Sequence, residues 1–265
     1  MPQPSATKPL GLPFIELQSV DSTNNYARQQ IHAGLAQHGL AIFAHEQVAG
    51  KGQRGKVWTT EKGSNIILSL VIKPHPLQLT QQFQLSACAA VAVHEFFLKY
   101  AGDETKIKWP NDLYWQDRKA GGLLIESGVR SRESGVESQQ LAMGHWQWAI
   151  IGIGININQT SFQGDLPNPV SLKQITGKNF DPVALAKELC GILDNRFTEL
   201  IEDGFENIYA YYLAHLYKRK ETVKLRKETK VFEALIEGVS PTGKLITQHA
   251  IEEEFDFGEV EWVIK

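Results

Sequence analysis

The feature that most restricts the fold is a basic, glycine-rich loop at residues 50–56, which lies between two apolar segments. Its sequence, Gly-Lys-Gly-Gln-Arg-Gly-Lys, has the spacing of a phosphate-binding P-loop, but a P-loop continues with Ser or Thr and then a helix. Here Val57 follows, and Ile66–Ile72 has the apolar run of a strand. We therefore expect no P-loop. Because glycines let a backbone approach a ligand closely, the loop is either a flap that closes on an anion or a solvated basic turn.

Size and composition fit an ordinary soluble protein. The 265 residues suffice for one large domain or a large and a small one; 42% of them are hydrophobic and 22% are charged. A net charge of −3 does not indicate nucleic acid as the main partner. Cys88 and Cys190 lie in apolar helical contexts without metal-ligand spacing, so we expect buried thiols. Residues 1–13 have no signal-peptide core and no apolar run reaches membrane length, so we expect a cytoplasmic protein without a membrane partner.

Apolar periodicity predicts the order of elements along the chain. Strands are expected at 14–20, 40–46, 66–72, 107–109, 121–126 and 146–157, and helices at 25–36, 85–100, 182–201 and 205–216. The polar residues 127–140 predict an exposed hairpin tip or mobile loop. Short alternating segments then predict strands at 221–226, 231–239, 244–248 and 251–257. The expected organisation is a flexible segment at 1–13, a mixed α+β domain at 14–217 and a small barrel at 218–265.

Three polar clusters adjoin these predicted elements. Ser22-Thr23-Asn24 precedes a helix and is either its cap or a set of donors and acceptors for a neutral polar ligand. The segment 108–112, Lys-Trp-Pro-Asn-Asp, ends a strand and is either a ligand site or a simple turn. The segment 118–122, Arg-Lys-Ala-Gly-Gly, sets two cations before paired glycines, which suggests an anion held close to backbone or an exposed turn.

Residues 151–158 predict a strand with one nearly bare face. Isoleucine occupies every second position, and glycine or asparagine occupies the others. The bare face leaves space for something flat to lie on it. The segment is not a dinucleotide-binding fingerprint, because the third glycine and the following helix are missing.

In this order, the clusters at 49–58, 108–112, 118–122 and 152–156 resemble the motifs of the biotin–protein ligases, also called holocarboxylase synthetases. The resemblance implies an α+β fold, with a mixed sheet and helices like those of class II aminoacyl-tRNA synthetases and an SH3-like C-terminal barrel. It also implies two reaction steps. Biotin and Mg·ATP form biotinyl-5′-adenylate, and a lysine of the biotin carboxyl carrier protein of an acetyl-CoA carboxylase then attacks the adenylate and releases AMP.

The resemblance also assigns roles to residues of this chain. The expected biotin contacts are Ser22, Thr23, Asn24, Gln47, Gly50, Lys51, Gly52, Gln53, Lys119, Gly122 and Gly152. The expected ATP contacts are Arg54, Trp58, Asn111 and Asn156, and the expected catalytic residues are Lys119, Arg54, Lys108 and Asp112, with Asp112 also near Mg²⁺. Biotin's carboxylate and ATP's phosphates repel one another in a partly dry site. Four cations, Lys51, Arg54, Lys108 and Lys119, would offset that repulsion by about 1.5–3 kcal/mol each.

Two features depart from the best-known relatives. Lys51 and Gln53 occupy loop positions where those relatives carry arginine, which leaves the phosphate contacts open. About thirteen residues precede the first predicted strand, too few for the DNA-binding winged helix of some relatives, so we expect no DNA partner. The alternative functions are a lipoate–protein ligase and a non-catalytic biotin- or nucleotide-sensing module. A homodimer is left open, since Trp146 and Trp148 fit either a partner-facing surface or the core.

Overall fold

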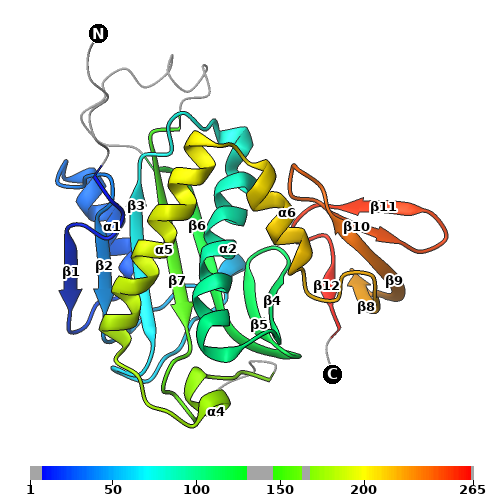
Figure 1. Ribbon diagram of the computed structural model, residues 1–265, viewed down its shortest axis with the longest axis horizontal. Helices are drawn as coiled ribbons and strands as arrows, with labels where there is room; N and C mark the ends of the chain where they lie inside the picture. The colour runs from blue at the N-terminus through cyan, green and yellow to red at the C-terminus, as the bar shows by residue number, and fades with distance from the viewer. Residues whose placement is uncertain (1–7, 130–145, 163–167, 264–265) are drawn as a thin grey trace.

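A computed structural model describes residues 8–129, 146–162 and 168–263 of the chain (Figure 1). Its centre is a seven-stranded sheet in the order β1-β2-β3-β7-β6-β5-β4. The strands are β1 Phe14–Leu17, β2 Ala41–Ala44, β3 Ile66–Ile72, β4 Thr105–Lys108, β5 Asp112–Trp115, β6 Arg118–Val129 and β7 Trp148–Ile155. Strand β1 is parallel to β2 and the other neighbouring pairs are antiparallel, so the sheet is mixed, as expected.

Helices cover both faces of this sheet. Helix α1, Thr23–His32, packs on one face against β2, β3 and β7. The other face carries α2 Gln82–Ala101, α4 Leu172–Thr176, α5 Pro182–Glu202 and α6 Glu206–Ala214 (Figure 1). Because α2 contacts the sheet, α5 and α6 at once, it is apolar around most of its circumference.

Successive side chains of β3 point to opposite faces of the sheet, so they lie in two different environments. The even-numbered residues from Ile66 to Ile72 pack in the larger core beneath α2 and α5. On the opposite face, Val71 packs beneath α1. The same face continues through the buried Ser69 to Ile67, which lines a cavity. The face that forms the α1 core therefore becomes the floor of the candidate site further along the strand.

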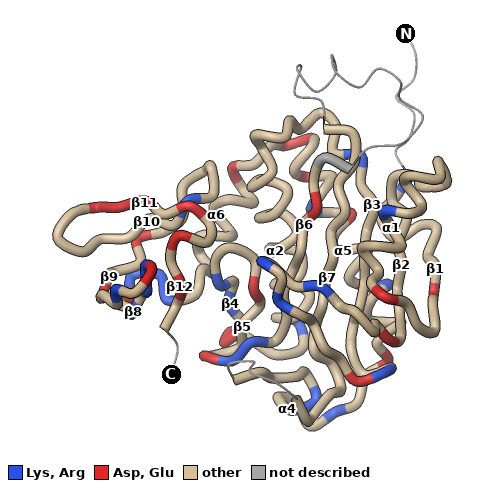
Figure 2. Tube along the Cα trace, turned by 180° about the vertical axis from the view of Figure 1, so that it is seen from behind, with Lys and Arg blue, Asp and Glu red and all other residues tan. Residues whose placement is uncertain are grey.

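The C-terminal residues form a second, antiparallel sheet in the order β11-β10-β9-β8-β12. Its strands are β8 Thr222–Lys227, β9 Lys230–Val239, β10 Leu245–Gln248, β11 Glu252–Phe255 and β12 Glu261–Trp262. The predicted turn joins β9 to β10, where Gly243 N donates to Ser240 O at 2.9 Å. Exposed glutamates mark the edge strand β11 (Figure 2), and charge on a free edge discourages pairing with another chain. The α+β fold with a C-terminal SH3-like sheet is confirmed.

The second sheet is attached beside the segment that follows β4. Trp109 Nε1 donates to Gly243 O at 2.9 Å, and Tyr209 Oη donates to Val239 O at 2.6 Å. The ring of Phe83 lies against Gly243, where an added Cβ would stand 2.6 Å from a ring carbon. Glycine is therefore needed at this turn, and the C-terminal sheet is fixed next to residues 108–112.

Several element predictions differ from the structure, among them the helix expected at 25–36, which is Thr23–His32, and the strand β12, which was not expected. The chain does not leave the sheet at Pro110 but returns as β5, with Lys108 opposite Asp112. Residues 127–129 belong to β6, whereas we expected them to begin the exposed loop, and 130–140 fall outside the described residues. Helix α4 was not expected, although its capping box, Ser171 with Gln174, is visible in the sequence.

Other expectations concern the surface of the chain. Residues 1–7 of the segment expected to be flexible are not described, but Leu10 is only 4% exposed and its N donates to Asp194 Oδ1 at 2.8 Å. Trp146 and Trp148 are both buried in the core of this chain. Among the described helices, none is long and apolar enough to cross a membrane.

Candidate active site

A cavity of about 580 Å³ opens between the seven-stranded sheet, the loop at 50–58 and the C-terminal sheet. Residues from each of the sequence clusters described above line this cavity. Of the expected site residues, the cavity is lined by Ser22, Thr23, Asn24, Gln47, Lys51, Gly52, Gln53, Arg54, Trp58, Lys108, Asn111, Asp112, Lys119, Gly122 and Gly152. The volume is typical of a small-molecule site.

One end of the cavity is a polar corner where α1 begins above β3. Thr23 donates to Gln47 Oε1 through N at 2.8 Å and through Oγ1 at 3.1 Å. Ser69 Oγ donates to Asn24 Oδ1 at 2.6 Å, which fixes the amide of Asn24. Asn24 Nδ2 is buried and has no hydrogen-bond partner among the described residues. Ser22 is the N-cap residue but its side chain makes no capping bond. The corner therefore keeps a free donor and a free hydroxyl for a polar ligand.

The bare face of β7 lies beneath two side chains. An added Cβ at Gly152 would stand 2.4 Å from Asn24 Oδ1, and one at Gly154 would stand 2.6 Å from Trp58 Cε2. Real Cβ atoms do not approach other atoms so closely, so glycine is required at both positions. The flat group expected on this face is, in this structure, the indole of Trp58. Its buried Nε1 has no partner among the residues described.

The loop at 50–58, called the flap below, is a narrow hairpin. Trp58 N donates to Gly50 O at 3.0 Å, and Gly52 N donates to Lys56 O at 2.7 Å. Arg54 at its tip has φ 55°, an unusual backbone conformation for a residue with a side chain. Its guanidinium lies against the C-terminal sheet, because an added Cβ at Gly258 would stand 3.1 Å from Arg54 Cζ.

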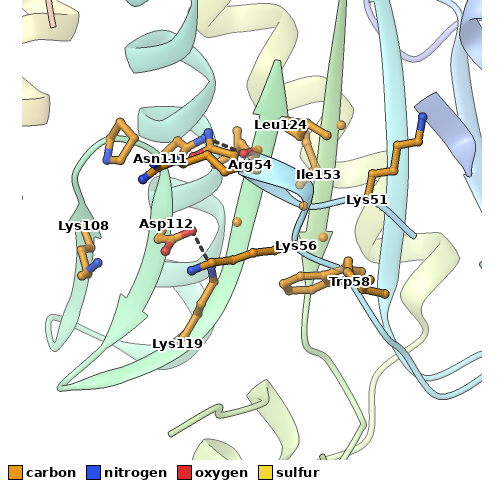
Figure 3. Close-up of a pocket in the computed structure, with 18 of the residues that line it drawn as sticks. Lys51, Arg54, Lys56, Trp58, Lys108, Asn111, Asp112, Lys119, Leu124 and Ile153 are labelled. Carbon is orange, nitrogen blue, oxygen red and sulfur yellow. Dashed lines mark hydrogen bonds and ion pairs between the residues drawn. The ribbon is translucent and has the colours of Figure 1, made fainter. Parts of the chain in front are cut away.

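Cations and one carboxylate gather at the other end of the cavity. Lys119 Nζ donates to Asp112 Oδ1 at 2.6 Å. Figure 3 shows Lys56 reaching from the flap towards the same carboxylate, while Lys51 points away. The Lys119 side chain is only 22% exposed, and its ammonium is ion-paired to Asp112. An added Cβ at Gly122 would stand 2.9 Å from Asp112 Oδ1, so glycine leaves room for this ion pair.

Some expected residues do not line the cavity. Gly50 instead closes the flap, where an added Cβ would stand 2.2 Å from Trp58 O. Asn156 is buried and its Nδ2 donates to Val170 O at 3.1 Å, so it supports the wall from behind. Arg118 donates to Pro169 O at 2.7 Å, and only Lys119 of the two adjacent cations faces the cavity.

The sequence interpretation missed the part of the wall that comes from the C-terminal sheet. These residues are Phe257, Gly258, Val260, Glu261 and Trp262. The only signal in the sequence was two aromatic side chains in an otherwise charged segment. Lys56 was also missed although it lies inside the 49–58 cluster, and so was Tyr114, two residues after the 108–112 cluster.

Comparison with known proteins identifies the family. Residues 16–156 match the family model described as Biotin/lipoate A/B protein ligase. The biotin–acetyl-CoA-carboxylase ligase of Paracoccus denitrificans is 31% identical over 237 residues, which cover 87% of this chain and 92% of that protein. The bifunctional ligase/repressor BirA of Bacillus subtilis is 29% identical over 246 residues, which cover 91% of this chain and 71% of that protein. The chain therefore belongs to the Biotin/lipoate A/B protein ligase family.

The fold comparison agrees. The biotin protein ligase from Aquifex aeolicus, solved in complex with biotin and ATP, matches with a TM-score of 0.77 and 24% identity, covering 95% of this chain and 99% of that one. These relatives and this neighbour share one enzyme class, biotin–protein ligase. The class expected from the motifs is confirmed.

Proposed function

We propose that this chain activates biotin with ATP in the cavity and transfers it to a lysine of the biotin carboxyl carrier protein of an acetyl-CoA carboxylase. The observation that carries the proposal is that one cavity joins a polar corner with unpaired hydrogen-bonding groups to a cluster of lysines around the carboxylate of Asp112. A neutral cyclic urea and anionic phosphates are the ligands that such a cavity would hold side by side.

The polar corner suits the ureido end of biotin. Asn24 Nδ2 would donate to the ureido oxygen, and the hydroxyls of Ser22 and Thr23 would accept from its N–H groups. The chain of biotin would then run beneath the flap towards Lys119, whose ammonium would hold the carboxylate. Gln53 on the flap is uncharged, so the carboxylate of biotin would be bound by the lysines and not by this residue.

The cationic end suits the phosphates of ATP. Lys56, Lys108 and Lys119 lie around Asp112, and charge-assisted bonds to the α-phosphate would strengthen as negative charge develops there. Trp58 offers a ring for the base. No group of three or more potential metal ligands occurs among the described residues. The site still fits Mg²⁺, because nucleotide-bound Mg²⁺ uses one or two carboxylates and takes its other ligands from phosphates and water. Asp112 would supply the carboxylate.

The acceptor is proposed from the relatives. The Paracoccus denitrificans relative is named as a ligase that joins biotin to acetyl-CoA carboxylase, and the two chains align over most of both lengths. A carrier lysine would reach the adenylate between the flap and the C-terminal sheet, where the cavity is bordered by Arg54 and Phe257. We expect neither DNA nor a membrane as a partner.

The test is incubation of the chain with biotin, Mg·ATP and a purified carrier domain, followed by intact mass measurement. We expect the mass of one biotinyl group on the carrier, and none when ATP is left out or the carrier lysine is replaced. Lipoate in place of biotin should support far less ATP–pyrophosphate exchange. Preferred exchange with lipoate would identify a lipoate ligase, and biotin binding without exchange would identify a sensing module.

A further inference from the structure

The side chain of Lys51 leaves the flap on the side away from the cations around Asp112 (Figure 3). Its Nζ donates to Asn25 Oδ1 on α1 at 2.6 Å, and Asn25 Nδ2 in turn donates to Asp21 Oδ2 at 2.5 Å. We call these three residues, Asp21, Asn25 and Lys51, the flap strap. A direct contact of Lys51 with biotin, as expected from the sequence, does not account for this arrangement.

Opposite charges at its two ends fix the amide of Asn25. The amide has a donor end and an acceptor end, and these face the carboxylate of Asp21 and the ammonium of Lys51. Turning the amide over would place its oxygen against the carboxylate and its NH₂ group against the ammonium. The bond from Asn25 lowers the pKa of Asp21, and the charge of Lys51 lowers it as well, so the carboxylate stays charged at neutral pH.

The first turn of α1 carries both the strap and part of the polar corner. Successive residues of a helix point in directions that differ by roughly 100°, so Asn24 lines the cavity while Asn25 faces the flap. The backbone continues this attachment, because Ala49 N donates to Asp21 O at 2.9 Å. Lys51 extends it by a side-chain bond into the flap itself.

We propose that Asn25 and Lys51 are positioning residues that strap the flap to the start of α1 and so lengthen the time that biotin stays in the cavity. This role rests on the function proposed above. Lys51 then acts on biotin through the flap and not by touching it. Both bonds of the strap lie at the surface, where water competes for the same groups, so the strap is weak enough to open when a ligand enters or leaves.

Asn25→Ala tests the proposal, because it removes both bonds and Asn25 is not among the described residues that line the cavity. Displacement of labelled biotin by excess unlabelled biotin measures the release rate. We expect release to become about three- to tenfold faster, the effect of losing one ordinary hydrogen bond, whereas the association rate should change little. Gln29→Ala, which removes an exposed amide one turn further along α1, is the matched control and should release biotin as the wild type does.

Lys51 variants separate a strap from a direct ligand contact. Lys51→Met should speed release by about the same factor as Asn25→Ala, and the double variant should release biotin no faster than either single one, because both changes break the same bond. Lys51→Arg keeps a charged donor and should release biotin more slowly than Lys51→Met. Effects that multiply in the double variant would show that Lys51 acts independently of Asn25 and would overturn the proposal.

Amide hydrogen exchange without biotin tests the strap separately from the proposed function. Exchange of the Gly52 and Trp58 amides, which close the flap hairpin, should be about threefold or more faster in Asn25→Ala than in the wild type or in Gln29→Ala. Equal exchange in all three proteins would overturn the strap. Faster exchange in Asn25→Ala together with wild-type protein that binds no biotin would instead refute the proposed function and leave the strap in place.

Discussion

Replacing Gly152 with alanine tests whether the polar corner binds biotin. The new Cβ would stand 2.4 Å from Asn24 Oδ1, so the amide must move by roughly 1 Å to reach ordinary van der Waals contact. That movement breaks the bond from Ser69 and redirects Asn24 Nδ2. Losing one or two hydrogen bonds of about 0.5–1.5 kcal/mol each predicts biotin binding that is about 10- to 100-fold weaker.

Stability should respond much less to the same change. Alanine in a strand gains about 0.5–1 kcal/mol over glycine, which nearly offsets the lost bond to Asn24. Calorimetric titration with biotin and thermal unfolding measure the two effects. Gly191→Ala is the matched control, since Gly191 is exposed on α5 with no atom within 4 Å of an added Cβ. A folded Gly152→Ala protein that binds biotin within threefold of wild type would refute this reasoning.

Three further predictions follow from other parts of the molecule. Lys119→Ala should lower ATP–pyrophosphate exchange by about 10²–10³-fold, while the free energy of unfolding should fall by about 1.5–3 kcal/mol because one charge-assisted hydrogen bond to Asp112 is lost. A large fall in melting temperature with unchanged turnover per folded molecule would contradict this. Burial lowers the pKa of His94 to about 4, so its ring binds a proton more readily in the unfolded state. Stability should therefore fall by up to about 3 kcal/mol as the pH drops from 6.5 to 4, measured by urea unfolding, and His94→Gln should flatten that slope. Amide exchange at 50–58 should slow on binding of biotin and ATP, and equal exchange with and without ligand would argue against a closing flap.

Much of the fold could be predicted because local patterns agree with the tertiary structure. The alternation of isoleucine with glycine at 151–155 predicts both the strand β7 and its bare face, and the structure requires glycine at Gly152 and Gly154 to admit Asn24 and Trp58. The strand β5 was missed because proline at 110 ends a strand by local rules. Only the tertiary pairing of Lys108 with Asp112 brings the chain back into the sheet.

The cavity's inner residues were predicted more completely than its outer wall. The motif residues at the cavity come from segments whose composition is itself unusual, and sheet pairing brings the segments on β5, β6 and β7 together. Nothing local distinguishes Trp262 from an ordinary core residue of a small barrel. Its place over Lys108 depends on contacts such as Trp109 with Gly243, which join residues distant in the sequence.

The part of the cavity wall formed by the C-terminal sheet affects how strongly the cations of the site interact with a charged ligand. Charges interact more strongly where water is excluded. Phe257, Gly258 and Trp262 close the side that the seven-stranded sheet leaves open, and Arg54 at the flap tip lies against Gly258. The C-terminal sheet thus forms part of the wall of the proposed active site. Substitutions on its inner face should therefore change the pH dependence and rates of the reaction before they change the stability of the fold.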